Sequence, residues 1–105
     1  MGPKTAELLQ LLQDTIELLE QYGKDWADWM QRSRRKIKAG DLSGVTWLLK
    51  AYGGMASFND LVIHPLNGHD VKADEVSQVN ERLQDLRHRM YELAVQVKRE
   101  AVMDE

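Results

Sequence analysis

Residues 76–97 read VSQVNERLQDLRHRMYELAVQV, and this stretch decides the fold. Its apolar side chains recur at steps of three and four residues, at Val76, Val79, Leu83, Leu86, Met90, Leu93 and Val97. This spacing places them on one face of a helix, as in three heptads of a coiled coil. We predict a helix over residues 74–100, a rod of roughly 40 Å at about 1.5 Å per residue.

The apolar seam of this rod can be covered in two ways. Shorter helices of the same chain need a surface to pack on, which favours a bundle within one chain. A homodimeric coiled coil is the alternative, but no Asn interrupts the seam to set the register of a dimer. We therefore expect either a monomer or a homodimer.

Three shorter helices are predicted before the rod, over residues 4–22, 25–38 and 42–52. Each has an apolar stripe at helical spacing, and a glycine follows each one, at Gly23, Gly40 and Gly53. Asp25 is a candidate cap for the second helix, and Asp41 or Ser43 for the third. The inward positions are Leu8, Leu12 and Leu19 in the first helix, Trp26, Met30, Ser33 and Ile37 in the second, and Leu42, Val45, Leu48, Leu49 and Tyr52 in the third.

Length and composition complete the picture of the fold. The chain has 105 residues, enough for one helical domain over residues 1–105, with a structured loop over residues 53–73 between the third and fourth helices. There is no Cys, which excludes disulfides, thiol catalysis and zinc sites that use Cys. No apolar run approaches the roughly 20 residues that cross a bilayer. We predict an all-α, four-helix bundle-like protein of the cytoplasm with no membrane association.

Charge is unevenly distributed along the chain. Residues 1–31 have a net charge of −4, whereas residues 32–50 have a net charge of +5. The basic cluster on the second helix comprises Arg32, Arg34, Arg35, Lys36 and Lys38. A solvated helix face near a C-terminus is the simplest interpretation of this cluster. The acidic pI of about 5.6 and the lack of aromatic residues among the bases argue against nucleic-acid binding.

No residue pattern indicates catalysis, a metal or a cofactor. Asp60, His64, His69 and Asp70 are close in sequence, but they surround a proline and an Asn-Gly turn without the regular spacing of metal ligands. A triad of Ser57, Asp60 and His64 lacks both a nucleophile elbow and an oxyanion hole. We therefore expect no enzymatic activity, no catalytic residue, no metal and no cofactor.

Trp47 is a candidate for binding a partner. It points away from the apolar arc of the third helix and lies near Lys50. Either the loop over residues 55–63 folds back and covers it, or it stands at a binding surface, where Trp beside a cation is typical of hot spots. The sequence leaves both alternatives open.

The loop after the third helix has a recognisable core. Gly53, Gly54, Met55, Ser57, Phe58, Asn59 and Asp60 resemble the Gly-Gly-Met-Gly-Ser-Phe-Asn-Asp-like motif of a family of small bacterial proteins of unknown function. The resemblance extends over about residues 42–66. This chain has Ala56 where the family usually has Gly, which costs about 1 kcal/mol if the position needs a positive φ. As a small, acidic, Cys-free helical protein, the chain is also similar in class to the immunity proteins encoded beside bacterial toxins.

These observations lead to two functional hypotheses. The first is a bacterial immunity protein that binds and neutralises a cognate toxin domain by occlusion. The expected partner-binding residues are Trp47, Lys50, Ser57, Phe58, Asn59 and Asp60, with an acidic surface formed by Asp14, Glu17, Asp25 and Asp28. The second is a regulatory or adaptor module that uses the basic segment 32–38 to bind nucleic acid or an acidic protein.

Overall fold

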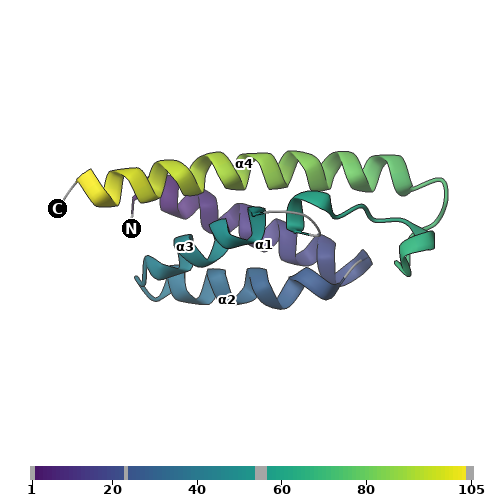
Figure 1. The fold of residues 1–105 in the computed structure, drawn as a ribbon, viewed down its shortest axis with the longest axis horizontal. Helices are drawn as coiled ribbons and strands as arrows, with labels where there is room; N and C mark the ends of the chain where they lie inside the picture. The colour runs from purple at the N-terminus through teal and green to yellow at the C-terminus, as the bar shows by residue number, and fades with distance from the viewer. Residues whose placement is uncertain (1, 23, 54–56, 104–105) are drawn as a thin grey trace.

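The fold is all-α, with four helices and a loop region between the third and the fourth (Figure 1). The computed structural model describes residues 2–22, 24–53 and 57–103. The helices are α1 (Pro3–Tyr22), α2 (Ala27–Lys38), α3 (Ser43–Leu49) and α4 (Val76–Met103). Short 3₁₀ helices lie between them: η1 (Lys24–Trp26), η2 (Lys50–Tyr52), η3 (Phe58–Asp60) and η4 (Pro65–Asn67). The predicted fold class is confirmed.

The long helix α4 runs the length of the molecule, which measures 48 × 25 × 20 Å (Figure 1). Helix α1 packs against α4 on one side and α2 on the other, and α3 packs between α2 and α4. The loop region over residues 57–75 lies beside the N-terminal half of α4 (Figure 1). The seam of α4 is thus covered within the chain.

The core follows the predicted apolar faces. Val79, Leu83, Leu86, Met90 and Val97 of the α4 seam are buried, together with Leu8, Leu12 and Leu19 of α1. Val76 and Leu93 pack at its edge. The seam prediction did not include Ala94, which is fully buried.

The joint between α2 and α3 is made by two glycines. Gly40 has a φ of +83°, and the Asp41 N–H donates to the Lys36 carbonyl oxygen at 2.8 Å, which is a Schellman ending. Gly44 lies so close to α2 that a Cβ atom there would be 2.8 Å from the Ser33 carbonyl oxygen. Ser33 Oγ in turn donates to the Gly44 carbonyl oxygen at 2.8 Å. The two helices therefore approach each other closely.

The predicted caps have different outcomes. Asp41 Oδ1 accepts a hydrogen bond from the Ser43 N–H at the start of α3, at 3.0 Å. Hydrogen bonds from Ser43, with the charge of Lys36 nearby, hold the pKa of Asp41 below its ordinary value. Asp25 does not cap α2, because the chain makes the η1 turn there and α2 begins without a side-chain cap. The prediction that Asp25 is that cap is wrong.

The remaining differences lie at the ends of the elements. The third predicted helix becomes α3 followed by the η2 turn, and Leu42 lies before it with 46% of its surface exposed. The fourth helix begins at Val76 and continues to Met103, past the predicted end. Gly23, expected to end the first helix, lies outside the described residues.

Candidate functional site

Trp47 packs against Trp29 of α2. The two indole rings are stacked, with centroids 4.1 Å apart and planes at 19°. Each Nε1 donates a hydrogen bond to the carbonyl oxygen of the other residue, at 3.1 Å in both cases. The Arg32 guanidinium lies over the Trp47 ring, with Cζ 4.2 Å from its centroid. Trp47 is therefore half-buried against α2. The sequence offered the loop as one of two possibilities for covering this ring, but the cover comes from α2.

The aromatic contacts continue from this pair into the loop. Trp26 contacts Trp29 at a centroid distance of 5.5 Å and Phe58 at 5.8 Å. Tyr52 meets Phe58 edge-on at 5.7 Å. Phe58 is 0% exposed and is thus a core residue. A partner could reach its side chain only if the loop moved, although the sequence suggested a binding role.

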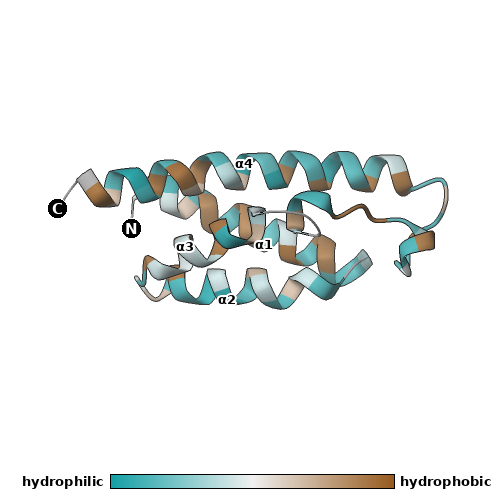
Figure 2. Cartoon of the chain, viewed as in Figure 1, coloured by the Kyte–Doolittle hydropathy of each residue, from teal (hydrophilic) through white to brown (hydrophobic). Residues whose placement is uncertain are grey.

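Helix α4 fastens the loop through two polar side chains. Asn80 pairs with both groups of the Ile63 peptide backbone: its Oδ1 accepts from the Ile63 N–H and its Nδ2 donates to the Ile63 carbonyl oxygen, each at 2.8 Å. Arg87 donates to the carbonyl oxygens of Phe58 at 2.8 Å and Leu61 at 3.1 Å. Figure 2 shows the apolar extended segment after η3 lying beside α4 at this point. The loop thus has a fixed position on the helix.

Tyr52 in η2 makes a further hydrogen bond to α4. Its hydroxyl donates to the Arg87 carbonyl oxygen at 2.7 Å. Burial raises the pKa of Tyr52 far above its ordinary value, and burial also lowers the pKa of Arg87. The Asn59 side chain donates to the Tyr52 carbonyl oxygen at 3.3 Å. Of the predicted motif, Gly54, Met55 and Ala56 lie outside the described residues, so the backbone at Ala56 stays untested.

The tip of the loop is held by its own hydrogen bonds. His64 Nδ1 accepts from the Leu66 N–H, and His69 Nδ1 accepts from the His64 N–H, both at 3.0 Å. Asn67 donates to the Val62 carbonyl oxygen at 3.0 Å, and Gly68 has a φ of +80° that suits glycine. This stiff turn presents Leu66 with 89% of its surface exposed and Val62 with 50% exposed.

Two adjoining hollows of about 440 and 250 Å³ lie between this tip and the end of α1. We call them together the acidic groove. They share Asp25, Asn67 and His69, and Trp26, Ser57 and Asp60 line the smaller one. The charged or titratable lining residues are Glu20, Tyr22, Lys24, Asp25, Asp60, His69 and Asp70.

The groove lies at the acidic end of the molecule. Residues 20–22, 24–28 and 57–82 lie at this end (Figure 1) and hold eight acidic and three basic residues, a net charge of −5. Tyr22 joins the end of α1 to the turn before α4 by donating to Glu75 Oε2 at 3.1 Å, and this hydrogen bond raises the pKa of Tyr22. The intervening residues 29–56 have a net charge of +5. The molecule is therefore strongly polarised along its surface.

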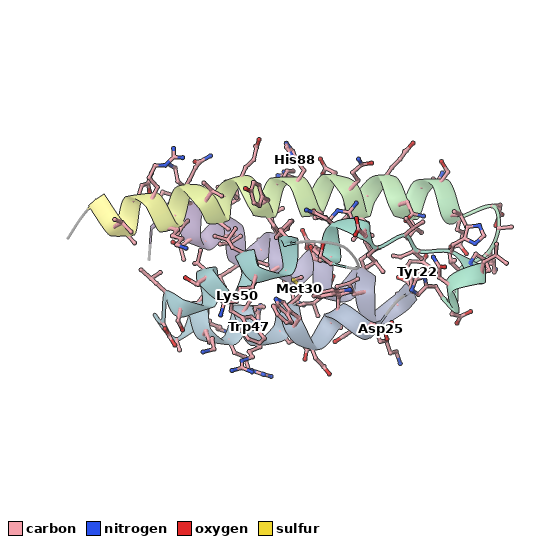
Figure 3. The ribbon with its side chains drawn as sticks, in the orientation of Figure 1. Tyr22, Asp25, Met30, Trp47, Lys50 and His88 are labelled. Carbon is pink, nitrogen blue, oxygen red and sulfur yellow. The ribbon has the colours of Figure 1, made fainter. Side chains whose placement is uncertain are left out.

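The predicted partner-binding residues do not form one surface. Asp25 and Asp60 lie in the acidic groove, with Ser57 buried beside them. Figure 3 shows Trp47 and Lys50 in the middle of the molecule, away from Asp25 and Tyr22. Asp14 and Glu17 lie on α1, where they accept from Gln10 and Gln13, each at 3.0 Å. Asp28 is exposed in the first turn of α2, and Asn59 is exposed at η3.

The basic cluster has several neighbours within the chain. Arg32 lies on Trp47, and Lys36 is 3.4 Å from Ser43 Oγ and 4.0 Å from Asp41 Oδ2. Arg35 and Lys38 are exposed on the outer side of α2. The cluster is thus divided between a packed part and a solvated part.

One further hollow, of about 360 Å³, lies on the other side of the loop. Tyr52, Asn59, Arg87, His88 and Tyr91 are among its lining residues. His88 points outward from α4 (Figure 3) and lies 3.1 Å from Glu92 Oε1.

Within the described ranges, no three His, Asp or Glu side chains gather as a metal site would require. None of the described helices is both long and apolar enough to pass through a membrane. These findings concern the described part of the chain only.

Residues 20–72 match the model of a family described as a domain of unknown function, DUF6966. The chain belongs to the DUF6966 family. No curated protein and no solved structure matches it. The expectation that the chain belongs to a family without known function is confirmed, over a longer segment than the 42–66 expected, whereas the motif that carried the resemblance stays a prediction. Every lining residue of the acidic groove falls inside the DUF6966 segment, whereas α4 and most of α1 lie outside it.

The sequence indicated no binding role for three residues that shape this site: Leu66, Val62 and Asp70, the last of which was considered only as a metal ligand. A local sign was present for Leu66, because a large apolar side chain stands inside the turn formed by Pro65, Asn67 and Gly68. Nothing local marked the groove itself, which forms only when the tip closes against the end of α1.

Proposed function

We propose that this DUF6966 protein is a small protein-binding protein of the immunity type, which neutralises a toxin domain by occluding the surface through which the toxin acts. The observation that supports this most is the loop tip. Leu66 is 89% exposed and Val62 is 50% exposed on a turn that is fixed by hydrogen bonds. Neighbouring apolar side chains on a stiff surface feature favour association, because little conformational entropy is lost on binding.

The charge distribution supports a basic partner. The end that carries the tip has a net charge of −5. Toxins that act on nucleic acid are often basic, and opposite charge speeds the encounter of two proteins. Association through this end should therefore slow as salt concentration rises.

The test begins with cross-linking in the cells that naturally produce the protein, followed by identification of the bound protein by mass spectrometry. The purified partner is then assayed for its own activity with increasing amounts of this chain. The proposal requires that the activity falls to near zero at about one molecule of this chain per partner. A partner that is saturated and still fully active would refute neutralisation.

A second candidate function is an adaptor module that binds an acidic protein or nucleic acid through residues 32–38. The exposed Arg35 and Lys38, in a segment with a net charge of +5 over residues 29–56, favour it. Binding to nucleic acid should weaken with salt, with a logarithmic slope of about −0.9 for each phosphate neutralised. Failure of the protein to be retained on DNA or RNA at low salt would end the nucleic-acid form of this hypothesis.

A further inference from the structure

We infer that the acidic groove receives an arginine or lysine side chain of the partner, while Leu66 and Val62 pack on apolar surface next to that side chain. This inference rests on the proposed function, because it assumes a protein partner, and it adds where that partner binds and with what chemistry.

The carboxylates of the groove favour a cation from outside the chain. Asp25 lines both hollows, Asp70 and Lys24 line the larger one, and Asp60 lines the smaller one, where it also interacts with the charge of Arg87. The Glu20 carboxylate already accepts a hydrogen bond from Gln31 at 2.6 Å. The negative charges of Asp25 and Asp70 attract a cation that enters the hollows. An arginine is suited to such a site because its planar group donates several hydrogen bonds at once.

Two further groups in the smaller hollow fit the same cation. Trp26 is half-buried there, and the face of an indole ring attracts ammonium and guanidinium groups. Ser57 lines the same hollow with 7% of its surface exposed, and its Oγ has no hydrogen-bond partner among the described residues. A buried hydroxyl without a partner is unusual, and a bound donor group would satisfy it. The carboxylates of Asp25 and Asp60, the Trp26 indole and the Ser57 hydroxyl therefore line the same hollow.

The rim of the groove supplies the apolar part of the contact. Leu66 and Val62 stand on the turn whose Asn67 and His69 form the wall of both hollows. A partner side chain that enters the groove thus brings its neighbouring residues onto the tip. Burial of two apolar side chains beside a charge-paired centre is the usual anatomy of a protein interface.

The first experiment uses a short amidated peptide that contains leucine and arginine, with a leucine–glutamate peptide as its control. Titration is followed by ¹⁵N NMR of the full chain. We expect saturable shifts for the arginine peptide at the backbone amides of residues 24–26, 57–62 and 66–70, and no such shifts for the glutamate peptide. Equal shifts for both peptides, or shifts spread over the whole molecule, would overturn the inference.

Two double variants separate the groove from net charge. Asp25→Asn with Asp70→Asn removes two carboxylates of the groove, whereas Asp14→Asn with Glu17→Gln removes two on α1. Both change the net charge by the same amount. The groove variant should bind the arginine peptide at least tenfold more weakly, and the α1 variant less than twofold. A similar loss in both variants would show a general charge effect and reject the site.

The tip is tested on the partner protein itself. Leu66→Ser should weaken partner binding at least tenfold, while Leu42→Ser, which changes an exposed leucine at the other end of the bundle, should not. A partner that is neutralised equally by the wild type, the groove variant and Leu66→Ser would reject this inference and leave the proposed function standing. Specific arginine-peptide binding in the groove, with a partner that keeps its activity, would reject neutralisation and leave the groove assignment standing.

Discussion

Replacing Trp47 by alanine tests whether this residue stabilises the fold. The change removes a stacked indole pair, a hydrogen bond to the Trp29 carbonyl oxygen and the contact with Arg32. Stacking contributes about 1 kcal/mol and the hydrogen bond about 1 kcal/mol. Removing about 60 Å² of half-buried indole from packing adds roughly 1.5 kcal/mol at about 25 cal/mol per Å². We expect the free energy of unfolding to fall by about 3.5 kcal/mol.

Urea unfolding followed by circular dichroism at 222 nm measures this loss, since it reports on the helices and not on the tryptophans. A cycle with Trp29→Ala and the double variant isolates the stacking term. Each indole donates to a backbone carbonyl, so that hydrogen bond remains when the other side chain is truncated. The coupling energy should therefore be about 0.5–1.5 kcal/mol.

A loss below about 1 kcal/mol for Trp47→Ala, with no coupling to Trp29, would refute this reasoning. That result would instead support the other alternative from the sequence, in which Trp47 lies at a binding surface. Trp47→Phe is a useful control, because it keeps an aromatic ring on Trp29 while it removes the hydrogen-bond donor and part of the ring surface. Its loss of stability should be about half that of the alanine variant.

Three other changes have defined outcomes. Gly44→Ala places a Cβ 2.8 Å from the Ser33 carbonyl oxygen and should cost about 1–3 kcal/mol in urea unfolding, whereas Gly2→Ala, with open space around it, should cost almost nothing. Asn80→Leu leaves both Ile63 backbone groups without their partner, so a loss of about 2–3 kcal/mol is expected, and no measurable loss would mean that the loop is not fastened there. Because burial raises the pKa of Tyr52, its stabilising effect is complete below about pH 10 and is lost as the pH rises above that value, at up to about 1.4 kcal/mol per pH unit. Unfolding measured between pH 9 and 11 should show a shallower decline for Tyr52→Phe, and an equal decline would contradict the assignment.

The helices could be predicted because their evidence is local. A seam with steps of three and four residues identifies α4 without knowledge of its neighbours, and Gly40 marks the end of α2 through its own backbone conformation. The η1 turn was not predicted, because the local sequence does not distinguish it from the first turn of α2. Asp25 suits the start of a helix, but the chain uses one more turn before α2 begins.

The candidate site depends on contacts between segments far apart in sequence. Asn80 and Arg87 lie on the predicted polar side of a helix, and nothing in their spacing shows that a loop binds there. Asp25 and Asp60 were predicted to bind a partner, and they meet in one groove only because the loop returns to the end of α1. Phe58 was predicted to bind as well, yet it is a core residue because the aromatic side chains of Trp26 in η1 and Tyr52 in η2 converge on it.

The pairing of one asparagine with both backbone groups of Ile63 also bears on which length changes the chain tolerates. An inserted or deleted residue between η3 and Ile63 would move a different peptide unit in front of Asn80 and turn the following side chains to the opposite direction. An insertion within residues 65–68 would only lengthen the turn beyond that anchor. We expect relatives with longer or shorter loops to differ at the turn. They should keep the number of residues between the backbone groups that Arg87 holds, at Phe58 and Leu61, and the Ile63 backbone that Asn80 holds.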